Sequence, residues 1–419
     1  MLKLFINSWK VKDIRNKILY TLLILAIVRL GAHIALPGID VVAIKASQNA
    51  YSTGTLYNII AGGYNSRWSI MAMGIGPYIT SSIIMQLLTV AIPKIEQLSK
   101  EGEEGRKKIS SYSRYLTVVL ALIQGIGMTY SYSGMFISDS KFLYVASVIS
   151  LVAGTMFVMW LAEQITAKGI SNGSSMIIFI NIVSNLPNGI RTLVYYAQTG
   201  DATGIIKVAA ILLILLVVLV FIVVINEGER RIPVQYSSKL AGRRNVGGQS
   251  SYMPIKVNTA GVISIIFAIS LLQFPEMISQ FIPAKGAFAK IIEILRMTHP
   301  IGAALYVLLI IFFAYFYTSI VINPNEIAEN MKKNGGFIPG IRPGQPTSAF
   351  ISRVVNRITL VGALVFACVA LVPILLQWIF GLSVGFGGTT LIIVVGVCLD
   401  IVKSLESQLL MRHYKGFLN

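Results

Sequence analysis

Charged residues are scarce in this sequence, and their scarcity excludes an ordinary soluble protein. Only 12% of the 419 residues are Asp, Glu, Lys or Arg, whereas 55% are hydrophobic. Because soluble domains carry about 25% charged residues, most of the surface of this chain must face something other than water. A mean hydropathy of +0.73 agrees with that. The sequence therefore predicts an integral membrane protein.

Residues that serve catalysis and metal binding are also rare. The chain has three His and two Cys. Both cysteines, Cys368 and Cys398, lie inside apolar runs, where we expect them to act as small packing residues. The sequence contains no zinc-type Cys/His spacing, no His-Glu-x-x-His, no P-loop and no candidate Ser-His-Asp set. It thus predicts neither an enzyme nor a cofactor, a metal site or a disulfide framework.

The apolar runs contain almost no ionisable side chains. Arg29 and His33 lie in the outer half of the first run, from which long side chains reach the interface. Ion-coupled transporters instead place ionisable groups near the middle of the membrane. We therefore expect a passive pathway that is driven from outside the chain. A small-solute transporter and a membrane scaffold are the alternatives.

Apolar runs of about 20 residues, the length of a membrane-spanning helix, are abundant. Unbroken runs favour helices over barrel strands, which alternate in polarity. We predict an all-α polytopic fold with ten spans, at approximately 18–36, 69–92, 113–132, 143–163, 174–195, 206–226, 258–280, 301–322, 354–376 and 387–407.

The distribution of basic residues predicts the orientation of these spans. Ten spans put both termini on one side, and the segments on that side hold 26 Lys and Arg, whereas the opposite loops hold 8. The positive-inside rule then places both termini in the cytoplasm. The basic N-terminal stretch leads into the first run without a cleavage site of small residues, so we expect that helix to be retained. Its charges are suited to anionic lipid.

Two of the cytoplasmic loops are longer than topology requires. Segments 227–257 and 323–353 have about 30 residues each and are rich in turn formers. The first is typical of a hairpin with a basic tip at Arg243 and Arg244, and its two prolines predict irregular arms. The second predicts a short helix over 325–333, followed by an exposed turn that carries Arg342.

Together the two loops predict a basic docking surface for an acidic protein or for RNA phosphates. Solvated loops without a partner are the alternative. A further segment, 54–66, is mildly apolar but too short to cross the membrane. It fits a helix folded back into the bundle and a helix lying in the interface equally well.

Six ordered stretches resemble the SecY family, the channel subunits of the Sec translocon, over essentially the whole chain. They are IALPGID at 34–40, MGIGPYITSSIIMQLL at 73–88, EGEEGRKKISSYSRY at 101–115, GTMFVMWLAEQIT at 154–166, NPNEIAENMKKNGGFIPGIRPG at 323–344 and FGGTTLIIVVG at 386–396.

The resemblance implies ten transmembrane helices in two pseudo-symmetric halves, 1–196 and 197–419, around an hourglass pore with a plug helix at 54–66. An apolar constriction would gate this pore by excluding water. By position in the matching stretches, the ring of that constriction is formed by Ile75, Ile79, Ser174, Ile178, Ile266 and Ile393. Ser174 departs from the family, which has an aliphatic residue at this position.

The resemblance also implies a lateral gate with a polar cluster of Thr80, Gln124 and Asn258. Arg230, Arg231, Arg243, Arg244 and Arg342 would dock SecA or the ribosome. The expected function is passage of unfolded secretory polypeptides across the bacterial cytoplasmic membrane and sideways release of transmembrane segments into lipid. The implied partners are SecE, SecG, the SecA ATPase, ribosomes, signal peptides and secretory precursors, together with anionic lipids.

Overall fold

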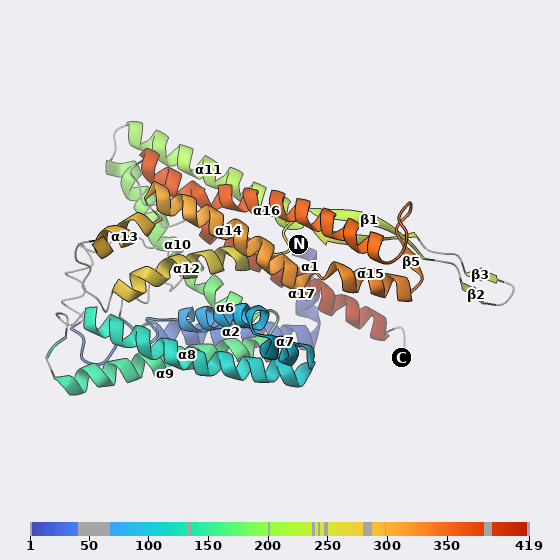
Figure 1. Cartoon of the computed structure of the whole chain (residues 1–419). Coiled ribbons are helices and arrows are strands. Elements are labelled where there is room, and N and C mark those ends of the chain that lie inside the picture. Colours follow the sequence, from blue (N-terminus) through green and yellow to red (C-terminus); the bar gives the residue numbers. More distant parts are fainter. Residues whose placement is uncertain are drawn as a thin grey trace. The chain divides into compact units, whose positions relative to one another are not determined.

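A computed structural model describes residues 2–40, 68–131, 134, 136–138, 140–199, 202–236, 239–241, 244–246, 250–279, 287–297, 299–380 and 388–416. The described chain is mostly helical, as predicted (Figure 1). It falls into two compact units. Unit 1 holds residues 1–208, 273–292 and 376–419, and unit 2 holds residues 209–272 and 293–375.

The helices are α1 (Leu2–Lys10), α2 (Lys12–Gly31), α6 (Gly76–Ala91), α7 (Pro93–Lys100), α8 (Glu103–Ser131), α9 (Lys141–Lys168), α10 (Gly173–Thr199), α11 (Ala202–Glu227), α12 (Ile263–Ser279), α13 (Ala287–Leu295), α14 (Pro300–Val321), α15 (Pro324–Lys333), α16 (Gln345–Phe380) and α17 (Gly388–Gly416). The strands are β1 (Glu229–Tyr236), β2 (Lys239–Ala241), β3 (Arg244–Val246), β4 (Ser250–Lys256) and β5 (Gly336–Phe337).

Each of the ten predicted spans overlaps one of these helices. By length and composition, five described helices are suited to cross a membrane, or six if α6 and α7 form one bent span. The presence of several apolar helices is therefore confirmed, while the count of ten stays a prediction.

Helix α6 ends at a sharp bend of 101°. Ile92 is extended, with ψ 113°, and Pro93 begins α7. A proline disfavours helical geometry in the residue before it and has no N–H to donate. The bend therefore falls at Ile92, which is also where the sequence changes from apolar to charged. Lys100 and Glu96 form an exposed ion pair one turn apart on α7.

In unit 1, helices α6, α8 and α9 pack side by side (Figure 1). The Ser81 hydroxyl donates to the buried Ser113 carbonyl oxygen at 2.6 Å, which joins α6 to α8. Arg114 on α8 pairs with Glu163 on α9 at 2.7 Å. Small residues allow close approach between membrane helices. A Cβ atom added at Gly154 would lie 2.1 Å from the Ile70 carbonyl oxygen, so the backbones are too close for a larger residue there.

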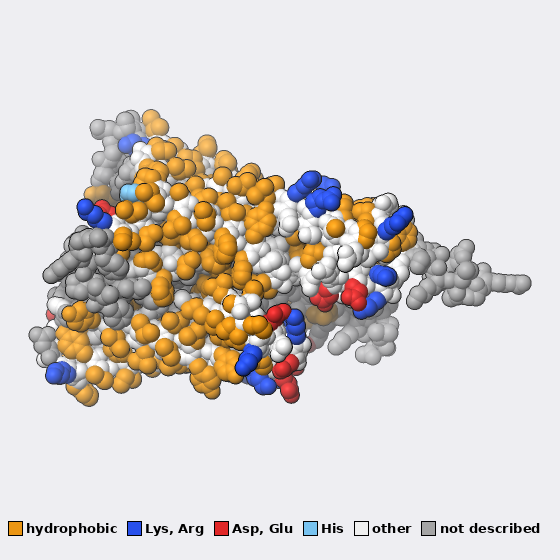
Figure 2. Space-filling model, viewed as in Figure 1, with side chains coloured by type: hydrophobic (Ala, Val, Ile, Leu, Met, Phe, Trp, Pro, Cys, Tyr) orange, Lys and Arg blue, Asp and Glu red, His pale blue; other side chains and the backbone are white. Residues whose placement is uncertain are grey.

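The surface of α11 shows why these helices need lipid around them. Ile211, Val218 and Ile222 are buried, whereas Leu213, at 65% exposed, and Leu216, at 64%, belong to a larger set of uncovered aliphatic side chains. Exposed apolar surface on this scale is unfavourable in water. In Figure 2, hydrophobic side chains cover the helices of unit 2, and Lys and Arg gather toward the end that carries the sheet.

The two compact units do not follow the predicted division into 1–196 and 197–419. Helix α17 packs on α1 and α10 within unit 1. Leu405 near its end is buried against Ile14 and Ile170. Since pseudo-symmetric halves are defined by repeated topology and not by compactness, that division stays a prediction.

Candidate functional site

The two long loops form one platform in unit 2. Strand β1 lies between β4 and β5 in a three-stranded antiparallel sheet, which draws strands from both loops. A shared core lies beneath it, formed by Ile232, Val234, Ile255, Met331, Ile338, Ile351 and Val355. The described parts of 227–257 and 323–353 are therefore one folded body, rather than two separate protrusions.

The arms of the hairpin are regular, which corrects the expectation of irregular arms. β1 pairs with β4 over seven residues, from Glu229↔Lys256 to Gln235↔Ser250. Pro233 pairs with Tyr252, and Pro254 pairs with Arg231, two residues apart along the ladder. In an antiparallel ladder, alternate pairs exchange no N–H bonds. Because the two prolines lie in pairs two steps apart, both can occupy pairs that exchange no N–H bond, where the missing N–H of proline costs nothing.

Arg230 and Arg231 are both exposed, but their environments differ. Arg231 is ion-paired with Glu229 at 2.8 Å, whereas Arg230 is exposed and forms no ion pair among the described residues. Surface ion pairs contribute little to stability, yet this one halves the positive charge available at that end of β1. Arg243 lies outside the described residues, and Arg244 belongs to β3.

Arg342 is presented as predicted, on an exposed turn between β5 and α16. Gly340 and Gly344, with φ of +82° and +103°, flank it in conformations that favour glycine. The Thr347 hydroxyl donates to the Arg342 carbonyl oxygen at 2.8 Å, which holds the backbone while the side chain remains in solvent.

The short helix predicted before this turn is α15. Asn323 caps its start by accepting from the N–H of Asn325 at 3.2 Å. The hydrogen bond and charge of Lys333 lower the pKa of Glu329 below its usual value. The two side chains form an exposed pair at 2.9 Å. The last helical residue is Lys333. Asn334 is the C-cap, and Gly335 follows it with a φ of +70°.

Four predicted ring residues are isoleucines of unit 1. Ile75, Ile178 and Ile393 are buried, at 2%, 3% and 1% exposed, and Ile79 is half-buried. Ile75 immediately precedes α6, and Ile79 lies in its first turn. Ile266, half-buried near the start of α12, belongs to unit 2.

Ser174, the one polar residue of the predicted ring, lies in the first turn of α10. Its N–H and its hydroxyl both donate to Asn172 Oδ1, at 3.0 and 2.7 Å. The side chain therefore helps to start the helix. An Asn-Gly-Ser sequence is a helix-start signal, so this role could have been predicted from the sequence.

Helices α10 and α17 contact each other near the start of α10. The Ser404 hydroxyl on α17 donates to the Ile170 carbonyl oxygen just before α10, and the two helices pack on each other. At a rise of 1.5 Å per residue, Ser174 lies about 2 Å into α10 and Ile178 about 8 Å. The place of Ser174 in the ring stays a prediction.

The three predicted gate residues have different hydrogen-bond environments. The Thr80 hydroxyl donates to the Gly76 carbonyl oxygen of its own helix at 3.2 Å. Gln124 Oε1 on α8 is buried without a partner among the described residues. Asn258 in unit 2 uses both ends of its amide, with Asn226 and with the N–H of Gly261. An unpaired buried acceptor such as that of Gln124 is costly.

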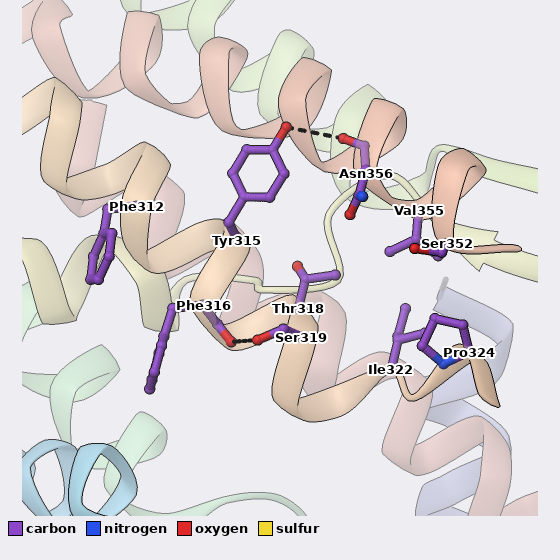
Figure 3. Close-up of a pocket in the computed structure, with 10 residues that line it drawn as sticks. All are labelled: Phe312, Tyr315, Phe316, Thr318, Ser319, Ile322, Pro324, Ser352, Val355 and Asn356. Atoms are coloured by element: carbon purple, nitrogen blue, oxygen red, sulfur yellow. Dashed lines mark hydrogen bonds between the residues drawn. The ribbon is translucent and has the colours of Figure 1, made fainter. Parts of the chain in front are cut away.

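Figure 3 shows an open groove of about 400 Å³ where α14 ends and α16 begins. The Tyr315 hydroxyl donates to the Asn356 carbonyl oxygen at 3.1 Å and closes one wall. No ionisable group other than Tyr315 lines it; the lining residues are Phe312, Tyr315, Phe316, Thr318, Ser319, Ile322, Pro324, Ser352, Val355 and Asn356. The groove thus offers no set of catalytic or metal-binding groups.

The predicted plug, 54–66, lies outside the described residues. Among the described residues, no group of three or more His, Cys, Asp or Glu is placed to hold a metal ion. The site that the described chain presents is therefore a basic platform and a set of buried isoleucines.

The SecY family model matches residues 69–402. The chain belongs to the SecY family. One relative is the protein translocase subunit SecY of Halalkalibacterium halodurans. The two sequences are 44% identical over 100% of both chains. The relative from Streptomyces galbus is equally similar, and that from Aquifex aeolicus is 44% identical over 98% of both chains.

Solved channel structures share the SecY fold at low sequence identity. One, described as a protein conducting channel, is 18% identical, with a TM-score of 0.65 over 93% of this chain and 91% of that one. Canine Sec61 in a ribosome-channel complex has a TM-score of 0.62 at 18% identity, over 93% of this chain and 91% of that one. The idle yeast Ssh1 complex bound to the 80S ribosome gives 0.63 at 15% over 96% and 90%. These likenesses establish the fold, and the family establishes a multi-pass protein of the bacterial membrane.

Proposed function

We propose that this chain is the protein-conducting channel of a bacterial Sec translocon. Full-length identity of 44% to translocase subunits carries this proposal. It passes unfolded secretory polypeptides across the cytoplasmic membrane and releases transmembrane segments into lipid. Ten spans in two halves surround the pore, with both termini in the cytoplasm. The channel performs no chemical step, and its energy comes from the partner that feeds it.

The constriction of this channel is an apolar ring. Its members are Ile75, Ile79, Ser174, Ile178, Ile266 and Ile393. Uncharged aliphatic side chains exclude water and ions by dewetting, and they deform around a polypeptide of any sequence. The segment 54–66 seals the ring from outside.

The lateral gate uses Thr80, Gln124 and Asn258. Hydrogen bonds between membrane helices contribute about 0.6 kcal/mol on average, so a few of them hold a gate that an apolar signal helix can still open. The unpartnered Gln124 Oε1 supports this role. Replacing all three residues with Leu should change which signal sequences are accepted. Unchanged acceptance across a graded set of signals would contradict this role.

The platform docks the driving partner, SecA or the ribosome, and the membrane partners are SecE and SecG. Its exposed arginines, Arg230 and Arg342, suit acidic protein surfaces and RNA phosphates. Arg231, Arg243 and Arg244 are proposed to take part in the same docking. A small-solute transporter is disfavoured, because the predicted spans lack a mid-membrane charge.

Reconstitution tests the function. Proteoliposomes with SecE and SecG, given SecA and ATP, should protect a secretory precursor from added protease. Arg342→Glu should abolish protection while the channel still inserts, because reversing this charge repels an acidic partner. Lys107→Glu, which changes net charge equally at another exposed site, should leave protection intact. Wild-type vesicles that protect no precursor would refute the function.

A further inference from the structure

The hairpin of the platform and helix α12 meet in a short, highly connected segment, residues 257–262. The Val257 N–H donates to the Gly228 carbonyl oxygen at 2.9 Å. This bond extends the β1–β4 ladder by one step, to the point where α11 ends. Both ends of the hairpin are therefore held at the end of α11.

Asn258 links the helix before the hairpin to the helix after it. Its Nδ2 donates to Asn226 Oδ1 at 2.7 Å, and its Oδ1 accepts from the Gly261 N–H at 2.8 Å. Asn226 in turn donates to the Ile222 carbonyl oxygen of α11 at 3.0 Å. A continuous path of hydrogen bonds thus runs from α11 through two amides to the turn that begins α12.

Small residues fix this segment between α14 and α16. A Cβ at Gly362 would lie 2.6 Å from the Val257 carbonyl oxygen, and Ala260 is packed with Ala314 and Ala363. In Figure 3 the segment is the pale-yellow trace between these two helices. Hydrophobic contacts are non-directional, whereas hydrogen bonds have preferred angles. The asparagine pair therefore sets the direction in which α12 leaves this packed segment.

We propose that Asn226 and Asn258 form a joint that transmits a displacement of the docking hairpin to α12. Asn226 is a positioning residue, because it holds Asn258 and does not touch the passing polypeptide. Helix α12 carries Ile266, eight residues beyond Asn258. A partner that tilts the hairpin thereby moves one side of the ring. The inference rests on the proposed channel function and adds a residue pair that couples docking to opening.

The test separates docking from coupling in the SecA-driven proteoliposome assay. Asn226→Leu removes the acceptor of Asn258 and should lower the precursor translocated per ATP about three- to tenfold, the range for one lost hydrogen bond. SecA affinity should stay within about twofold, because the basic surface is untouched. Asn226→Asp keeps the acceptor of Asn258 but loses the donor to the Ile222 carbonyl oxygen, so it should retain more coupling than Asn226→Leu. Asn16→Leu, the same change at an exposed Asn of α2, is the matched control.

Three results would overturn the joint. Wild-type coupling in Asn226→Leu would show that the bond is unnecessary. Loss of SecA binding in parallel with translocation would show that the pair only folds the hairpin. Effects of Asn226→Leu and Asn258→Leu that add in the double variant would show that the two residues act separately. If Asn226→Leu does not assemble, Asn226→Ser, too short to reach Asn258, replaces it. Failure of wild-type vesicles would instead refute the channel function.

Discussion

At the scale of single residues, the role of a side chain on α10 depends on how far along the helix it lies. Ser174 begins α10 by bonding to Asn172, whereas Ile178 and Ile182 lie one and two turns further in and are buried. Residues four apart share a helix face, so the two isoleucines form one apolar strip. The serine does not interrupt that strip, because it lies before it.

Ion leak tests the assignment of Ser174 to the ring. Ser174→Ile should lower the ion conductance of the resting channel several-fold, because a hydroxyl wets an apolar constriction. Ile182→Ser should change conductance less, since its side chain lies about 12 Å further along α10. Single-channel recording in planar bilayers measures both. Unchanged conductance in Ser174→Ile would exclude that residue from the ring.

At the scale of elements, helix contacts in unit 1 depend on where glycine is placed. Gly154 on α9 meets the Ile70 carbonyl oxygen, with 2.1 Å left for a Cβ, whereas the nearest atom to a Cβ at Gly125 on α8 is Val148 Cγ1 at 3.6 Å. The first contact leaves no room for a methyl group, and the second is ordinary van der Waals contact. Helix α9 therefore requires glycine at position 154, whereas α8 has room for a larger residue at position 125.

The two glycines should respond oppositely to alanine. Gly154→Ala should destabilise the protein by about 1–3 kcal/mol through overpacking. Gly125→Ala should be neutral, or stabilising by up to about 1 kcal/mol, because alanine has the higher helix propensity. Thermal unfolding in detergent, followed by loss of monodisperse protein, compares them. Equal midpoints for the two variants would contradict the close contact at Gly154.

At the scale of the whole molecule, the chain combines a lipid-facing helical body with a basic folded platform. The platform exists because strands from two loops share one sheet. They pair at Gln235↔Phe337 and at Tyr236↔Gly336, about 100 residues apart in sequence. A docked partner therefore meets one rigid surface. In the proposed channel, the ring and the segment 54–66 together are expected to keep the pore closed at rest.

Deletion of 54–66 tests this seal. The resting conductance of reconstituted bilayers should rise several-fold, because the deletion removes one of the two elements that are proposed to close the pore. Translocation of precursor should persist, since the driving partner acts on the opposite face. A deletion variant that conducts no more than wild type would refute the plug.

Much of the candidate site followed from local signals. Asn323, Pro324 and Gly335 delimit α15, and glycines on either side of Arg342 mark an exposed turn. Such signals act within a few residues and are visible in the chain itself. The hairpin arms were also predictable, but their regularity was not. The ladder is regular because both prolines fall in pairs that exchange no N–H bond. Which pairs those are is determined by the register with the partner strand.

The sequence by itself determined the membrane class, the helical character and the basic character of the two loops, because composition, run length and charge act locally along the chain. Tertiary structure alone decided that the loops share one sheet and that Asn226 holds Asn258. These depend on register and contact between segments distant in sequence. No local preference specifies such contacts, because they are selected by packing of the whole unit.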